Sequence, residues 1–211
     1  MNDSSVHTLQ RLRAEAGRNW VFFRQWLRAP LRTASVVPSS PRLGRAMAMA
    51  LPADVRRVVE LGAGTGAITR ALLQHRLQAA DLFVLELNPE LHAGLKQEFA
   101  GAAVVCGDAR ELPQLLRRTE RFSDGQTDAV VSSLGFLSMP EGLVEAIVAA
   151  TLECLPAHGC IVQFTYGPKC PIPAAIMERF QLQARRVDFT LLNLPPASVY
   201  LVQRRSAARV G

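Results

Sequence analysis

A short glycine-rich segment carries the clearest chemistry in this 211-residue chain. Residues 57–61 form an apolar, β-branched stretch typical of a strand buried in a parallel sheet. A turn containing Gly62, Gly64 and Gly66 follows directly. Glycine lets the backbone approach a bound molecule closely, and the helix expected after the turn would point its N-terminus at that molecule. Glu60, just before the turn, favours a cationic ligand over a pyrophosphate because it is a carboxylate.

Two more acidic residues follow predicted strands. Glu86 ends the strand at 81–85, and Asp108 with Ala109 follows the strand at 102–106. An acidic residue about 20 positions after such a turn binds ribose hydroxyls. An acidic residue after the third strand resembles the adenine-contacting position of class I methyltransferases. We therefore predict S-adenosylmethionine as the cofactor, held by Glu60, Gly62, Gly64, Gly66, Glu86, Asp108 and Ala109.

The glycine turn leaves alternatives open. Gly62, Gly64 and Ala67 also fit the looser dinucleotide pattern G-x-G-x-x-A. Glu86 and Asp108 could each be an ordinary helix N-cap after a strand, a place where acidic residues are favoured. Three acidic residues, each at the end of a different strand, are better explained by one cofactor site than by unrelated helix caps.

An alternation of strands and helices would position these residues. It predicts an α/β fold, a Rossmann-like, doubly wound and mostly parallel seven-stranded sheet. Because only a short link joins the last two strands, one of them is expected to be antiparallel. The predicted strands are 57–61, 81–85, 102–106, 127–132, 160–166, 184–191 and 199–203, and the predicted helices are 42–51, 67–75, 89–99, 110–116, 141–154 and 174–182.

Composition narrows the class of protein. The length suits one compact catalytic domain, which we place at residues 52–211, preceded by a docking helix and lid segment at 1–51. Four cysteines without a C-x-x-C pair indicate reduced thiols rather than a zinc site or a disulfide framework. No signal peptide is evident, and no apolar run reaches the ~18–20 residues needed to span a bilayer.

The net charge of +6 is unevenly distributed along the chain. Residues 1–57 carry ten arginines against three acidic residues, a net +7, whereas the remaining 14 basic and 15 acidic residues give −1. Such asymmetry predicts a polyanionic partner, either anionic lipid or nucleic acid, for the N-terminal segment.

That segment also has a helical pattern. One apolar stripe with helical spacing runs through Leu9, Leu12, Ala16, Trp20, Phe23 and Leu27, with arginines off the stripe. A cationic amphipathic helix rich in Trp, Phe and Leu is typical of a membrane interface with anionic lipid. The alternative is a helix packed on the domain's own sheet, and both hold if the helix docks reversibly.

With these features the chain resembles the soluble bacterial phospholipid N-methyltransferases, and the resemblance spans nearly its whole length. The motifs that carry it are Phe23-x-x-Trp26-Leu27-x-x-Pro30, Val37-Pro38-Ser39-Ser40-Pro41-x-Leu43, Val59-Glu60-Leu61-Gly62-x-Gly64-Thr65-Gly66, Glu86-x-Asn88-Pro89, Gln163-Phe164-Thr165-Tyr166 and Asn193-x-Pro195-Pro196-Ala197-x-Val199-Tyr200. The chain departs from the family at Ala34-Ser35 and at Ser132-Ser133-Leu134-Gly135, beside the expected substrate entrance.

The resemblance implies stepwise N-methylation of phosphatidylethanolamine towards phosphatidylcholine, at the inner face of the cytoplasmic membrane. The partners would then be a phospholipid substrate and an anionic membrane surface, without nucleic acid. The expected site residues are Tyr166, as an amine contact or an ordinary strand-end tyrosine; Ser132; and Asn193, as a headgroup contact or a turn cap. Phe136 could line the same end of the sheet or lie in the core.

Two rival functions share some of these features. A ribosomal RNA adenine dimethyltransferase would explain the basic N-terminus, but residues 132–136 lack the Asn-x-Pro-Tyr-type motif that such enzymes have after strand four. A non-catalytic membrane-binding protein would retain the fold without binding the cofactor. Binding of S-adenosylhomocysteine, the demethylated product, would distinguish an enzyme from such a non-catalytic protein.

Overall fold

A computed structural model describes residues 41–166, 168–190 and 197–205 of the chain. The predicted helix in the N-terminal segment and Asn193 lie outside the described residues. Within the described ranges, no helix is both long and apolar enough to cross a membrane.

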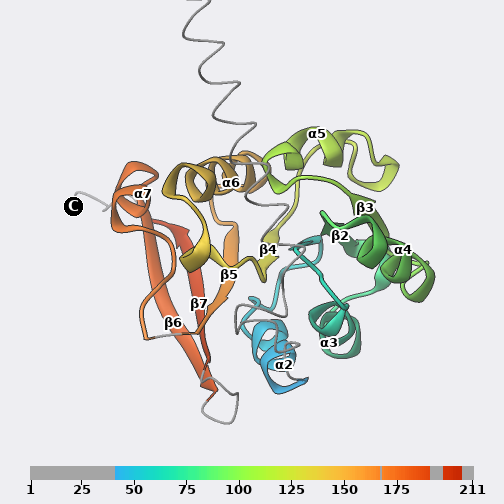
Figure 1. The fold of residues 1–211 in the computed structure, drawn as a ribbon, viewed down its shortest axis with the longest axis horizontal. Helices are drawn as coiled ribbons and strands as arrows, with labels where there is room; N and C mark the ends of the chain where they lie inside the picture. Colours follow the sequence, from blue (N-terminus) through green and yellow to red (C-terminus); the bar gives the residue numbers. More distant parts are fainter. Residues whose placement is uncertain (1–40, 167, 191–196, 206–211) are drawn as a thin grey trace, which may run out of the picture. The chain divides into compact units, whose positions relative to one another are not determined.

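The described core is a seven-stranded sheet with the order β3-β2-β1-β4-β5-β7-β6 (Figure 1). Neighbouring strands from β3 to β5 are parallel, and β7 runs antiparallel to both β5 and β6. The predicted doubly wound, mostly parallel sheet is confirmed, and β7 is its antiparallel strand. The strands are β1 Val58–Leu61, β2 Leu82–Glu86, β3 Ala103–Cys106, β4 Ala129–Ser132, β5 Cys160–Thr165, β6 Leu182–Thr190 and β7 Ala197–Arg204.

Helices cover both faces of this sheet. Buried side chains of α2, α3 and α4 join one core cluster, and those of α5, α6 and α7 join another, on the opposite face. Successive strand residues alternate between the two clusters, since Val58 belongs to one and Val59 to the other. The helices are α2 Pro41–Met49, α3 Ala67–His75, α4 Pro89–Glu98, α5 Leu112–Arg117, α6 Glu141–Cys154 and α7 Ala174–Arg179, with 3-10 turns η1 Ala79–Asp81, η2 Ala109–Glu111, η3 Glu120–Phe122 and η4 Phe136–Ser138.

The predicted elements differ from the observed ones mainly at their ends. α7 stops at Arg179 rather than at residue 182, and Gln181 takes a left-handed conformation, with φ of 52°, before β6 begins. The helix predicted from residue 110 starts as η2 and becomes α-helical at Leu112, with a proline in its first turn. Proline suits that position because its missing N–H would have no helical partner there.

Helix α2 is part of the sheet domain's core. Leu43 and Met47 are fully buried, and Gly44 lets α2 approach α3, because a Cβ there would lie 3.0 Å from the Cβ of Ala71. The domain boundary after residue 51 remains a prediction.

All four cysteines are free thiols. Burial raises the pKa of both Cys154 and Cys160 to about 12, so these two thiols stay protonated at neutral pH.

Candidate active site

The glycine turn joins β1 to α3 at the carboxyl end of the sheet. Gly62, Gly64 and Gly66 all have positive φ, at 73°, 57° and 77°. A Cβ on Gly62 would come within 2.7 Å of Leu134 Cδ2, and one on Gly66 within 2.6 Å of Phe99 Cε2. A Cβ on Gly64, by contrast, would have no closer neighbour than Gly62 O, at 4.0 Å. The outer two glycines are thus packed against side chains, while the middle one leaves room for a ligand to approach the backbone.

Glu60 is fully buried behind this turn. Its Oε2 accepts a hydrogen bond of 2.6 Å from Thr69 Oγ1 on α3, and its Oε1 has no hydrogen-bond partner. Burial raises the pKa of this carboxyl to about 7, although the Thr69 bonds act to lower it. A cation close to Glu60 would stabilise the ionised form and satisfy the remaining oxygen.

Glu86, at the end of β2, closes the turn from the other side. Its Oε2 accepts from Gly64 N at 2.8 Å and its Oε1 from Asn88 N at 2.8 Å. The N-cap of α4 is Asn88, whose side chain accepts from Glu90 N and Leu91 N. The alternative that Glu86 is the cap of this helix is therefore wrong, and its carboxylate instead orders the glycine turn.

Asp108 has the capping role that the sequence left open. Its Oδ1 accepts from Arg110 N at 2.8 Å at the start of η2. Its carboxylate also pairs with the Arg110 guanidinium, whose Nη2 lies 2.7 Å from Oδ2. Ala109 is the first residue of η2. Contact between Asp108 and a cofactor remains a prediction.

The loop after β4 lies against the glycine turn. Ser133 Oγ donates to Gly62 O, and Ser133 N donates to Leu61 O at 3.1 Å. Ser132 is buried, and its Oγ accepts from Leu134 N at 3.3 Å. Phe136 is 5% exposed and belongs to the core, as one of its two interpretations expected.

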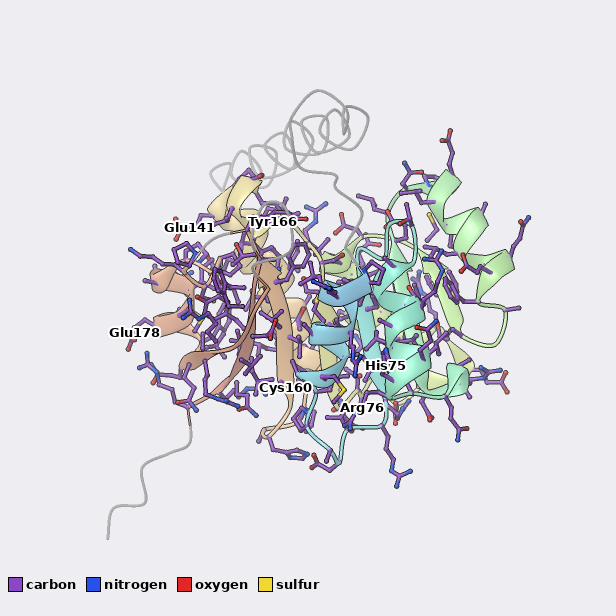
Figure 2. The ribbon with its side chains drawn as sticks, turned by 90° about the horizontal axis from the view of Figure 1, so that it is seen from below. His75, Arg76, Glu141, Cys160, Tyr166 and Glu178 are labelled. Carbon is purple, nitrogen blue, oxygen red and sulfur yellow. The ribbon has the colours of Figure 1, made fainter. Side chains whose placement is uncertain are left out.

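Tyr166 follows β5 at the same end of the sheet. Figure 2 shows it at the opposite end of the domain from Cys160, which begins β5, and from His75 and Arg76 at the end of α3. Its ring is partly exposed and packs edge to face on Phe164, with the centroids 5.3 Å apart. The ring therefore lies at the carboxyl end of the sheet, and its contact with a substrate amine stays a prediction.

Comparison with known proteins identifies the kind of enzyme. Residues 58–159, from β1 to the start of β5, match the family described as a methyltransferase domain. Over 185 residues the chain is 34% identical to an ornithine lipid N-methyltransferase from Singulisphaera acidiphila, covering 86% of this chain and 93% of that protein. The chain belongs to the S-adenosylmethionine-dependent N-methyltransferases.

Solved structures agree with this N-methyltransferase in fold. A TehB-like SAM-dependent methyltransferase from Corynebacterium glutamicum superposes with a TM-score of 0.54 and 18% identity, covering 90% of this chain and all of that one. TrmN from Thermus thermophilus gives a TM-score of 0.55 and 17% identity over 78% of this chain. The chain spans about half of TrmN, 49% of its length. At these identities the likeness shows the fold alone.

The residues around the turn fit S-adenosylmethionine, the cofactor of this N-methyltransferase. Glu60 Oε1 is a buried oxygen without a partner, and a cationic sulfonium compound is the kind of ligand that such an oxygen stabilises. Side chains leave the backbone at Gly64 uncovered, so there is room for the predicted close approach of the cofactor, which stays a prediction. Within the described ranges, no three His, Cys, Asp or Glu side chains group as metal ligands.

Sequence reasoning missed three residues at this end of the sheet. Ser133 holds the turn, while Gln163 and Thr165 on β5 are buried and each keep one oxygen without a partner. Ser133 and Gln163 make contacts with distant parts of the chain, whereas Thr165 Oγ1 has no partner. The available signals were the polar residues in the apolar segment at 160–166 and their place in the motif Gln163-Phe164-Thr165-Tyr166.

Proposed function

We propose that this N-methyltransferase methylates the amine of a membrane aminolipid, with phosphatidylethanolamine as its substrate. The observation that carries the proposal is the 34% identity to a lipid N-methyltransferase over 86% of the chain. That alignment extends well beyond the methyltransferase domain at residues 58–159, so it includes regions outside the shared cofactor fold.

Ornithine lipid is the second candidate substrate, because the aligned relative carries that name. Phosphatidylethanolamine and an ornithine-based lipid both present an amine at the membrane surface, and only the former carries a phosphodiester. Purified enzyme supplied with each lipid and labelled S-adenosylmethionine would separate them. If only the ornithine lipid were methylated, it would be the substrate instead of phosphatidylethanolamine. If neither lipid were methylated, the proposed function would be wrong.

For the cofactor, we assign binding to the turn and the acids around it. When bound, S-adenosylmethionine supplies a methyl group activated by its positive sulfur. Glu60 would balance the cofactor's positive charge, Glu86 would hold the turn and meet the ribose, and Asp108 with Ala109 would meet the adenine. Asp108 would have to share its carboxylate with Arg110, or release it, when the cofactor binds.

On the acceptor side, Tyr166 would contact the amine, and its ring face would hold the methylated ammonium through a cation–π contact. Ser132 would act through the loop that it holds at Leu134 N. Asn193 stays a predicted headgroup contact. Tyr166→Phe tests the first assignment, because it removes the hydroxyl and keeps the ring: slower turnover supports a hydroxyl contact, and unchanged turnover would remove that contact.

We further propose that the enzyme works at the inner face of the cytoplasmic membrane. A groove of about 390 Å³ between α2 and α3 supports this, because all of its charged lining residues are basic. It is lined by Pro41, Arg42, Arg45, Ala67, Arg70, Ala71, Gln74 and His75. Arg70 pairs with Glu98, whereas within the described ranges the guanidinium groups of Arg42 and Arg45 have no ion pair. Free arginines on a groove wall favour anionic headgroups.

The predicted N-terminal helix would add to this attraction. Removing residues 1–30 should sharply lower binding to vesicles that contain anionic lipid, and added salt should weaken the binding of the full chain. Equal binding of the shortened and full chains would refute the assignment of that helix.

A further inference from the structure

Two buried oxygens on β5 lack hydrogen-bond partners. Gln163 is fully buried and its Oε1 is unpaired; Thr165 is 4% exposed and its Oγ1 is unpaired. An unsatisfied buried polar atom destabilises the folded state, so each one in a native protein calls for an explanation such as a functional role. Both residues lie on the same face of the strand, since they are two positions apart.

The orientation of the Gln163 amide is fixed by its donors. Its Nε2 donates to Leu134 O at 3.0 Å and to Phe164 O at 2.8 Å. Turning the amide over would place its oxygen against both carbonyls, so the oxygen is the atom left without a partner. The amide thus connects the loop after β4 with the backbone of β5, on the strand face that also carries Thr165.

Gln163 is connected to the glycine turn through Leu134. Leu134 accepts from Gln163 through its backbone oxygen, and its side chain is the group that a Cβ on Gly62 would strike at 2.7 Å. In register, Gln163 pairs with Ser132 on β4, which in turn pairs with Leu61 at the end of β1. The oxygens are therefore at the end of the sheet where the cofactor is expected.

We infer that Gln163 Oε1 and Thr165 Oγ1 accept the two N–H bonds of a neutral primary amine on the substrate. The inference rests on the proposed aminolipid function. Two acceptors match the two N–H bonds and leave the nitrogen lone pair free to attack a methyl group. Both acceptors are uncharged, so in a buried site they favour the neutral amine over the ammonium ion, which a carboxylate would stabilise.

When the amine takes a methyl group, the methyl donor leaves as S-adenosylhomocysteine and the methylated ammonium ion then releases one proton to water. Each round therefore leaves the neutral amine with one N–H bond fewer, so it should bind this pair less well than its precursor. A neutral dimethylated amine has no N–H bond left. The contribution of Gln163 and Thr165 should therefore be largest for the primary amine and smallest for the dimethylated one.

Thr165→Val tests the inference, because valine has nearly the same shape without the hydroxyl. We expect KM for phosphatidylethanolamine to rise roughly three- to tenfold, the loss of about one hydrogen bond. KM for the dimethylated lipid and the affinity for S-adenosylhomocysteine should stay unchanged. Denaturant unfolding should show equal or higher stability, since an unpaired buried hydroxyl is removed. Thr165→Ser should restore the wild-type KM.

Thr119→Val is the matched control, because Thr119 Oγ1 donates to Leu115 O at 2.9 Å on α5. It should lose stability and keep its kinetics. Gln163→Met provides a second variant and should also raise KM for the primary amine more than for the dimethylated one. If Thr165→Val lost stability and kept its KM, or raised KM equally for both lipids, the inference would be overturned. Failure of the wild-type enzyme to methylate any aminolipid would instead overturn the proposed function.

Discussion

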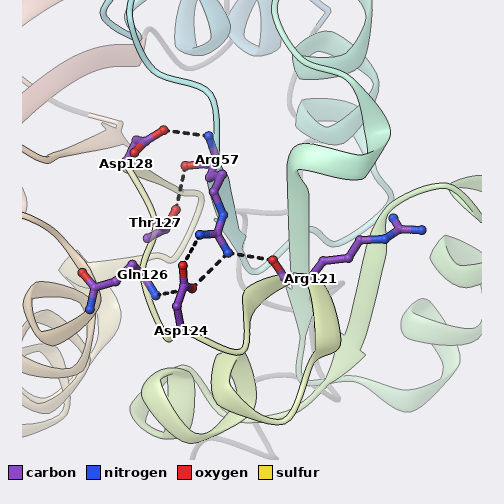
Figure 3. Close-up of polar contacts among 6 residues, drawn as sticks. All are labelled: Arg57, Arg121, Asp124, Gln126, Thr127 and Asp128. Carbon is purple, nitrogen blue, oxygen red and sulfur yellow. Dashed lines mark hydrogen bonds and ion pairs between the residues drawn. The ribbon is translucent and has the colours of Figure 1, made fainter.

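The two ends of the parallel sheet differ in how completely their polar groups are hydrogen-bonded. At the amino end, both the side chain and the backbone of Arg57 are hydrogen-bonded (Figure 3). Its guanidinium donates to the Asp124 carboxylate and to Arg121 O. Its backbone N–H donates to Asp128, and its backbone oxygen accepts from Thr127 Oγ1. At the carboxyl end, three buried oxygens have no partner. In the described part of the chain, no other buried side-chain N or O atom lacks a hydrogen-bond partner.

The difference separates stability from function. The amino-end network satisfies its donors and acceptors within the protein, as expected of a group that only joins β1 to β4. The carboxyl end leaves Glu60, Gln163 and Thr165 incompletely bonded, at a cost to the folded state. Substitutions at the amino end should therefore affect folding alone, whereas substitutions that remove one of the three unpaired oxygens should shift folding and ligand binding in opposite directions.

The largest effect is expected at the glycine turn. Gly66→Ala should lower the free energy of unfolding by about 3–5 kcal/mol, because it adds left-handed strain and a contact of 2.6 Å with Phe99. Gly64→Ala is the matched control, with similar strain and open space around the new methyl group, and should cost only about 1–2 kcal/mol. Denaturant unfolding measures both; equal losses would show that packing at Gly66 is unimportant.

Glu60 should make the stability of the cofactor-free protein depend on pH. Its folded pKa of about 7 lies above the ordinary value of 4.5, so between these values the folded state keeps a proton that the unfolded state has lost. Stability should thus fall as pH rises from 4.5 to 7, by about 3 kcal/mol. Glu60→Gln should remove most of this slope.

The same carboxyl should couple cofactor binding to pH. A cation favours the ionised form, so affinity for S-adenosylmethionine should rise with pH through about 7 in the wild type and stay flat in Glu60→Gln. Calorimetry between pH 5.5 and 8.5 would measure both. A wild-type affinity that does not change with pH would contradict the placement of the cofactor's positive charge beside Glu60.

Asp128 tests the amino end. Its Oδ2 accepts from Arg56 N at 2.9 Å and Arg57 N at 2.8 Å, so Asp128→Ala should cost about 2 kcal/mol of stability and leave cofactor affinity unchanged. Asp128→Asn keeps one acceptor oxygen and should lose less. A large fall in cofactor affinity, at a temperature where the variant is folded, would erase the distinction between the two ends.

The smallest effect is expected on the groove between α2 and α3. Arg42→Ala and Arg45→Ala should each weaken binding to anionic vesicles about fivefold, since a basic residue near such a surface contributes about 1 kcal/mol. Arg118→Ala is the control, because Arg118 is exposed on the opposite face of the sheet, after α5. Vesicle co-sedimentation measures all three, and equal losses would indicate a general charge effect instead of a specific groove.

Local sequence patterns predicted what depends on local physics. The β-branched run at β1 gave the strand, and the three glycines gave a turn in which all three have positive φ. The bond from Ser133 to Gly62 joins residues 71 apart, and the bond from Gln163 to Leu134 joins residues 29 apart. No short-range pattern encodes such pairs, so these contacts could be seen only in the folded sheet, whose order places β4 between β1 and β5.

Leu134 has a practical consequence for anyone who wishes to redesign this enzyme for bulkier amines. Its backbone oxygen anchors Gln163, its amide reaches Ser132, and its side chain covers Gly62. A smaller side chain at this position would also uncover the glycine turn, where we propose that S-adenosylmethionine binds. A substitution of Leu134 that broadens substrate specificity should therefore also lower the affinity for S-adenosylmethionine. Other positions are better first choices for such a redesign.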